Sequence, residues 1–244
     1  MKLPHVAIAL AALAALAALV ALAPASPGQS PATPGRSPAA EEKKPEKPKA
    51  QAAAWTPLFN GKDLEGWKPA GAAVWKVEDG CLVGTQTDGK GGDLFTEKEF
   101  DNFEVRFTYR MAWPANSGIW FRDKYQFDIL KWKNPVGFSG TLYCPGKMFI
   151  TTNLDESVEN RDGWNEGHIY ANGDHLILWL NGKKVGECDD KTAAKGRVGI
   201  QVHQGDGFKG MAIHLKRLEI RPLKPGDPPS EPAKPEPAPP KAEK

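Results

Sequence analysis

The 244-residue sequence has little cysteine, no familiar catalytic signature and almost no net charge. Its three cysteines, Cys81, Cys144 and Cys188, permit at most one internal disulfide, and no spacing resembles a CxxC metal motif. GxSxG, HExxH and phosphate-binding glycine loops are also missing, which argues against the enzyme classes that these motifs define. A formal net charge of +2 gives no reason to expect a nucleic acid or another anionic polymer as a partner.

The two ends of the chain lack the residues that build a core. Residues 1–25 resemble a secretory signal, with Lys2 before an unbroken apolar run and small residues near the end. The run also approaches the ~17 residues of a membrane-spanning helix, so an uncleaved N-terminal anchor is the alternative. Residues 26–54 and 224–244 are rich in Pro, Ala, Lys and Glu, and we expect them to be disordered tethers without packed contacts. The sequence thus predicts an exported protein, periplasmic or extracellular, either released or held at a membrane.

Between these ends, residues 55–223 are predicted to form one all-β domain. Short segments of alternating apolar and polar residues dominate this region, and no segment keeps a long helical period. Asp79-Gly80 and Asn181-Gly182 each separate two such segments, which is the strongest sequence signal for a hairpin turn. We therefore expect a sandwich of two antiparallel sheets.

The stretch NSGIWFRDKYQFDIL, residues 116–130, mixes large apolar side chains with polar ones of an unusual kind. Strand side chains alternate between two faces, so a hairpin across Asp123 and Lys124 would gather on one face Trp120, Arg122, Gln126 and Asp128. The same alternation in GRVGIQVHQG places Gln201 and His203 on a polar strand face. An indole, a guanidinium, amides and a carboxylate on one surface suit a sugar better than bulk water.

Each of these side chains also has a purely structural interpretation. Arg122 and Asp128 would form a cross-strand ion pair without any chemistry. His203 would be a solvated surface residue, and Asn116 would serve a turn at the strand entrance. These alternatives remain open from the residues alone.

The ordered motifs WTPLFNGKDLEGWK, VEDGCLVG, GGDLFTEKEFDNFEVRFTYR, NSGIWFR, WLNGKKV and GRVGIQVHQG resemble one known family over nearly all of residues 55–223. That family is DUF1080, described as 3-keto-α-glucoside 1,2-lyase / 3-keto-2-hydroxy-glucal hydratase or 3-keto-disaccharide hydrolase. The resemblance implies a concanavalin-like jelly roll whose concave sheet binds carbohydrate. The sequence departs from the family where YQFDIL replaces a YEVQIL-like strand, and where residues 131–163 form a longer insert.

The resemblance also implies a reaction, in which a 3-keto-glycoside is cleaved by elimination across C1–C2 and the 2-hydroxy-glucal is then hydrated. Asp128 and His203 are predicted to share the roles of base and acid, either residue taking either role, and Arg122 is predicted to stabilise the enolate oxygen. The predicted substrate-binding residues are Trp120, Gln126, Gln201, Lys131, Asn116 and Trp164. A divalent cation on Asp128 and His203 would fit, but two ligands are too few to assert one. A non-catalytic carbohydrate-binding module and a glycosidase with two carboxylates are the alternatives.

Overall fold

The computed structural model describes residues 53–232 and 235. The predicted signal peptide or anchor over residues 1–25, nearly all of the linker over 26–54 and the end of the tail lie outside the described residues. Within the described part, no helix is long and apolar enough to cross a membrane.

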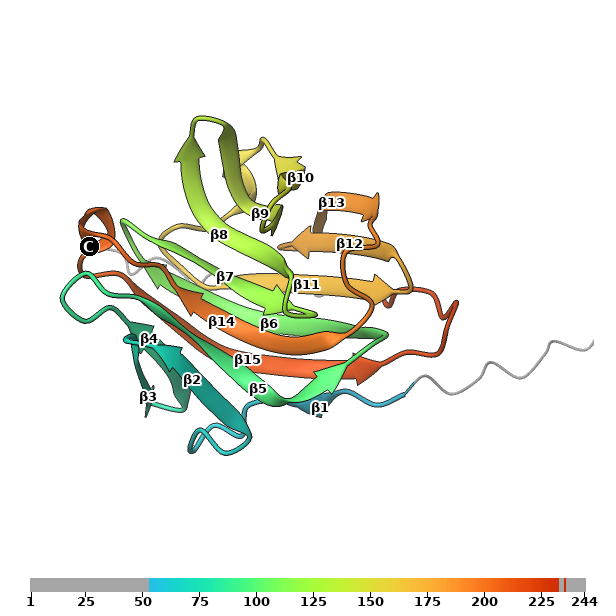
Figure 1. Cartoon of the computed structure of the whole chain (residues 1–244), viewed down its shortest axis with the longest axis horizontal. Coiled ribbons are helices and arrows are strands. Elements are labelled where there is room, and N and C mark those ends of the chain that lie inside the picture. The colour runs from blue at the N-terminus through green and yellow to red at the C-terminus, as the bar shows by residue number, and fades with distance from the viewer. Residues whose placement is uncertain (1–52, 233–234, 236–244) are drawn as a thin grey trace, which may run out of the picture. The chain divides into compact units, whose positions relative to one another are not determined.

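Two antiparallel sheets make up the domain (Figure 1). One sheet has eight strands, in the spatial order β13 (Lys183–Asp189), β12 (His175–Leu180), β11 (Asn165–Asn172), β6 (Phe103–Ala112), β15 (Ala212–Pro222), β4 (Cys81–Thr85) and β3 (Val74–Glu78), with β1 (Thr56–Pro57) beside β15. The other has seven strands, in the order β10 (Met148–Asn153), β9 (Val136–Cys144), β8 (Tyr125–Lys133), β7 (Asn116–Phe121), β14 (Gly196–Val202), β5 (Gly92–Phe100) and β2 (Trp67–Gly71). The helical elements of the described residues are two short 3₁₀ turns, η1 (Glu156–Val158) and η2 (Asp206–Phe208). The prediction of an all-β sandwich of two antiparallel sheets is confirmed.

The core lies between the two sheets and follows from the two-residue period of the strands. In β6, Phe103, Val105 and Phe107 are fully buried, and in β8 Phe127 and Ile129 are fully buried as well. The rings of Phe107 and Phe127 meet edge to face with centroids 5.2 Å apart, which joins the two layers. The thiols of all three cysteines are free, so packing and strand ladders hold the domain without a disulfide.

Both hairpin turns predicted from the sequence are present. Asp79 and Gly80 connect β3 to β4 with φ angles of 51° and 72°, and Asn181 and Gly182 connect β12 to β13 with 50° and 79°. Positive φ at both central positions is what a tight turn between twisted strands requires, and Asx-Gly pairs tolerate it best.

The segment that follows β15 departs from the expectation for residues 224–244. The Ser230 backbone N–H donates to Glu104 at 2.7 Å, and the Tyr170 hydroxyl donates to the Asp227 carbonyl at 2.8 Å. Packed contacts with the eight-stranded sheet therefore continue past residue 224. Composition does not predict these contacts, because they use backbone groups and one serine and not buried apolar surface.

Candidate functional site

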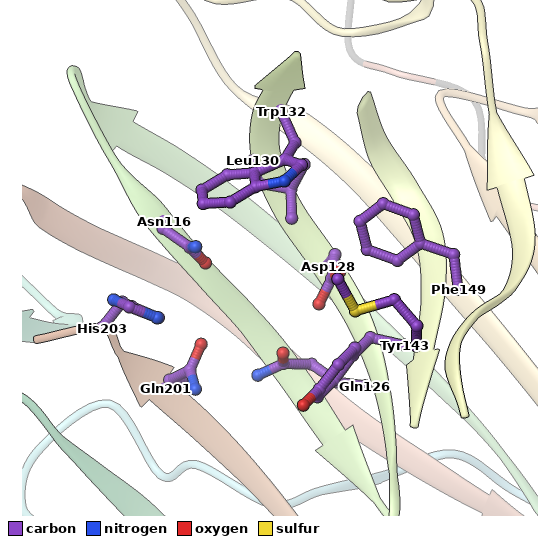
Figure 2. A pocket seen from close by; sticks show the side chains of 10 residues that line it. Asn116, Gln126, Asp128, Leu130, Trp132, Tyr143, Phe149, Gln201 and His203 are labelled. Atoms are coloured by element: carbon purple, nitrogen blue, oxygen red, sulfur yellow. The ribbon is translucent and has the colours of Figure 1, made fainter. Parts of the chain in front are cut away.

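A pocket of about 220 Å³ opens on the outer face of the seven-stranded sheet (Figure 2). Strands β7, β8, β9, β10 and β14 supply nearly all of its lining. The lining residues are Asn116, Gln126, Asp128, Leu130, Trp132, Tyr143, Met148, Phe149, Gln201 and His203. Five of the predicted site residues therefore lie together, namely Asn116, Gln126, Asp128, Gln201 and His203.

Strand register arranges the outward side chains in rows across this face. Their immediate neighbours along the chain, such as Leu94, Ile119 and Ile200, are fully buried in the core. One row, here called the carboxylate row, crosses β5, β14, β7 and β8 as Asp93, Gln201, Gly118 and Asp128. The adjacent row continues to β9 as Phe95, Gly199, Trp120, Gln126 and Tyr143. The pocket lies over the β8 ends of both rows.

Asp128 lies among the lining side chains in Figure 2 and is only 3% exposed. No described residue donates a hydrogen bond to its carboxylate or pairs with it. Burial raises the pKa of the Asp128 carboxyl well above its usual range, because the charged form loses water without gaining a partner. An isolated buried carboxylate is costly for folding, and such groups are concentrated in functional sites.

Three amide side chains, those of Asn116, Gln126 and Gln201, line the pocket together with Asp128 (Figure 2). Nε2 of Gln126 is a buried donor, and Oε1 of Gln201 a buried acceptor, without a partner among the described residues. Asn116 is 9% exposed and also lines the pocket. Each unsatisfied buried group costs about 1–3 kcal/mol, which a polar ligand in the pocket would recover.

His203 follows β14 directly, and its backbone N–H donates to the Asn116 carbonyl at 3.2 Å. Its Nδ1 lies 2.5 Å from the carbonyl oxygen of Gln204. Since a carbonyl can only accept, the proton resides on Nδ1, and Nε2 is the acceptor nitrogen of the neutral ring. His203 lines the pocket, and Nε2 is its ring nitrogen without a hydrogen-bond partner among the described residues.

The β9–β10 hairpin and the end of β8 form an apolar wall of the pocket. Trp132 is its most accessible aromatic residue at 38% exposure, and its Nε1 donates to the Asn134 carbonyl at 2.9 Å, which fixes the indole. None of the five residues of this wall is among the site residues predicted from the sequence, namely Leu130, Trp132, Tyr143, Met148 and Phe149. Tyr143 lies opposite Gln126 in the pairing of β8 with β9. Knowledge of that register would have predicted its place in the pocket, but the sequence of the insert does not reveal which residues pair.

Arg122 does not lie on this face, and the prediction that it accompanies Asp128 there is wrong. Strand β7 ends at Phe121, and Arg122 has a φ of 51°, so the alternation of a strand no longer applies to it. The residue is 1% exposed. It donates to the backbone carbonyls of Asp101 at 2.6 and 2.9 Å, Gly173 at 2.7 Å and Ala193 at 3.1 Å.

Three predicted substrate-binding residues are also placed differently from the rest. Lys131 pairs with Glu156 at 2.5 Å and points away from its lining neighbours Leu130 and Trp132. The guanidinium of Arg110 lies over the Trp164 ring, with its Cζ 5.1 Å from the ring centroid. Trp164 does not line the pocket. Trp120 shares the pocket's sheet face but is 8% exposed.

Within the described part of the chain, no metal site is evident. Among residues 53–232 and 235, no group of three or more His, Cys, Asp and Glu side chains could hold a metal ion. Asp128 and His203 therefore lack a third protein ligand of these types.

Solved structures support the assignment of the fold. A putative glycosyl hydrolase from Parabacteroides distasonis aligns with a TM-score of 0.55 and 20% identity over 70% of this chain and 94% of that chain. A protein of unknown function with a galectin-like fold from Bacillus subtilis aligns with a TM-score of 0.52 and 12% identity over 70% of this chain and 96% of that chain. These similarities confirm the jelly-roll architecture.

Sequence comparison places the chain in a family. A 3-keto-disaccharide hydrolase from Bacteroides thetaiotaomicron is 32% identical over 109 residues, which cover 38% of this chain and 37% of that relative's length. The model of the 3-keto-alpha-glucoside-1,2-lyase-like domain matches residues 54–221, nearly the whole of the described domain. The chain belongs to the 3-keto-alpha-glucoside-1,2-lyase-like domain family.

Proposed function

We propose that this carbohydrate-active enzyme cleaves 3-keto-glycosides by elimination across C1–C2 and then hydrates the 2-hydroxy-glucal. The observation that carries the proposal is Asp128, a carboxylate buried at the pocket without a protein partner and with a raised pKa. A ketone at C3 acidifies the C2 proton, and a carboxylate whose pKa is raised by burial is a stronger base toward it than an ordinary aspartate.

The first step needs a base and a group that holds the developing negative charge. Asp128 takes the C2 proton, and the electron pair of the C–H bond moves into an enolate whose charge lies on the C3 oxygen. Gln126, which follows the same face of β8 two residues before Asp128, offers an unpaired buried N–H donor to that oxygen. This role replaces the one predicted for Arg122, whose guanidinium is engaged elsewhere.

The second step expels the group at C1. The enolate collapses to a C1–C2 double bond while the C1–O bond breaks, and the leaving oxygen takes a proton. His203 supplies this proton from Nε2 when its ring is protonated, because its Nδ1 is already committed to Gln204. Hydration then adds the water oxygen to C1 while His203 takes the proton that this water loses. The Asp128 carboxyl, after exchanging its proton with solvent, protonates C2, so both groups return to their starting states.

The test is to incubate the purified protein with a 3-keto-disaccharide and to follow the release of the second sugar. The matched control is the same disaccharide with a hydroxyl at C3, which lacks the acidic C2 proton and should remain intact. Release of sugar from the keto substrate alone supports the elimination. Binding of the keto substrate without release contradicts it and favours the carbohydrate-binding module.

Trp132 is expected to provide a stacking surface for the sugar. Replacement by alanine should raise KM roughly 10-fold and leave kcat nearly unchanged, because stacking stabilises the bound ground state and the transition state alike. Steady-state kinetics on the keto substrate measure this. Trp164→Ala is the matched control, since that indole lies outside the pocket, and an equal rise in KM in both variants would contradict the assignment.

A further inference from the structure

The carboxylate row extends beyond the pocket to a second acidic side chain, Asp93 on β5. Asp93 and Asp128 stand on the same sheet face with β14 and β7 between them, so three strand spacings of ~4.8 Å put their Cα atoms about 14 Å apart. This Cα separation exceeds the ~5–10 Å between the carboxyl groups of a glycosidase pair. It suits a ligand longer than one sugar ring, because at ~1.5 Å per bond a disaccharide is roughly 10 Å long.

Two glycines on the strands between the two carboxylates carry no side chain of their own. Gly118 lies in the row between them, and a Cβ there would come within 2.6 Å of Cγ of Gln126. Gly199 of the adjacent row has the same character, since a Cβ would come within 2.4 Å of Cδ1 of Phe95. The side chains of Gln126 and Phe95 thus lie over these two glycines. At these positions β7 and β14 contribute no side chain of their own that could block a ligand.

Asp93 is held in place but not neutralised. The Trp120 indole N–H donates to its Oδ1 at 2.8 Å, while no described residue donates to its Oδ2 or forms an ion pair with it. Burial raises the pKa of the Asp93 carboxyl, and the Trp120 hydrogen bond and the charge of His203 oppose that rise. A half-buried carboxylate with one fixed and one free oxygen is a ready acceptor for sugar hydroxyls.

From this geometry we infer that the face of β14 and β5 beside the pocket binds the leaving group of the reaction, and that this leaving group is a sugar. The inference rests on the proposed function, which places the 3-keto ring over Asp128. Oδ2 of Asp93 accepts hydrogen bonds from hydroxyls of the second ring. Trp120 acts as a positioning residue that aims this carboxylate, which also explains why a mostly buried indole lies on a polar face.

The test compares two substrates that differ only in the group at C1, a 3-keto-disaccharide and methyl 3-keto-α-glucoside. Asp93→Asn should lower kcat/KM for the disaccharide roughly 10-fold, the size of one hydrogen bond to a charged group, and change the value for the methyl glucoside by less than about two-fold. Trp120→Phe, which keeps an aromatic ring and removes the donor, should shift the same ratio in the same direction by a smaller factor. Asp162→Asn, in an exposed turn, is the matched control and should leave both values unchanged.

The outcomes separate this inference from the proposed function. If the wild-type protein cleaves neither substrate, the proposed function is wrong and the inference falls with it. If the wild type cleaves both, and Asp93→Asn affects both equally or neither, the second-sugar site is overturned while the elimination stands. Selective loss on the disaccharide in Asp93→Asn, with thermal melting unchanged, supports the site.

Discussion

Replacing Asp128 by asparagine is expected to lower kcat on a 3-keto-disaccharide by roughly 10²-fold or more, the range for a lost acid-base group. Asparagine has nearly the same volume, so packing against the buried neighbours of β8 is kept, but it cannot take a proton from C2. Progress curves for the two proteins at equal concentration measure the loss. His203→Gln is the parallel variant and should reduce turnover through the leaving-group step.

The same substitution should not destabilise the fold. The folded-state pKa of Asp128 is raised above the unfolded value near ~3.9, so the folded state binds its proton more tightly. By linkage, this carboxyl makes stability fall as pH rises from the unfolded pKa through the folded one. Asp128→Asn removes that loss, so its free energy of unfolding at neutral pH should equal or exceed that of the wild type. Denaturant unfolding at several pH values measures this, and a variant that is both inactive and less stable would indicate a structural role instead.

Arg122→Met is expected to lower the free energy of unfolding by about 3 kcal/mol or more, because hydrogen bonds to charged groups contribute about 1.5–3 kcal/mol each. The substitution leaves the carbonyls of Asp101, Gly173 and Ala193 without their shared donor. Turnover per folded molecule should stay near wild type, since the guanidinium does not reach the pocket. Thermal melting beside an activity assay on the folded fraction makes the measurement.

Arg122→Lys is the control for charge alone. It keeps the cation but not the planar fork that serves three carbonyls, so an intermediate loss of stability is expected. An Arg122→Met protein that melts like the wild type but has lost its turnover would contradict the structural role and indicate that Arg122 takes part in the reaction.

The two-residue period of the strands was enough to predict the fold class and much of the pocket. It placed Gln126 and Asp128 on one face and Phe127 and Ile129 on the other, as the structure has them. The rule failed at Arg122 because alternation holds only inside a strand, and the residue's positive φ turns its side chain elsewhere.

Other site features depended on pairings that a single sequence does not reveal. Asp93 and Asp128 share a row only because β14 and β7 pair between them, and these strands are distant along the chain. The apolar wall likewise forms only because β9 pairs with β10. Both strands lie in the insert, whose sequence did not indicate which residues pair. Alternation gives the face of a side chain, whereas register decides its neighbours across the sheet.

Cleavage of a 3-keto-disaccharide in deuterium oxide, with the product followed by NMR, tests the proposed elimination most directly. Elimination passes the C2 hydrogen to Asp128, which exchanges it with solvent before hydration returns a hydrogen to C2, so the released 3-keto-glucose should carry deuterium at C2 from its first appearance. Free 3-keto-glucose incubated with the protein under the same conditions corrects for exchange after release. A product that forms at the enzymatic rate while keeping its original hydrogen at C2 would contradict the elimination and the role of Asp128 as its base.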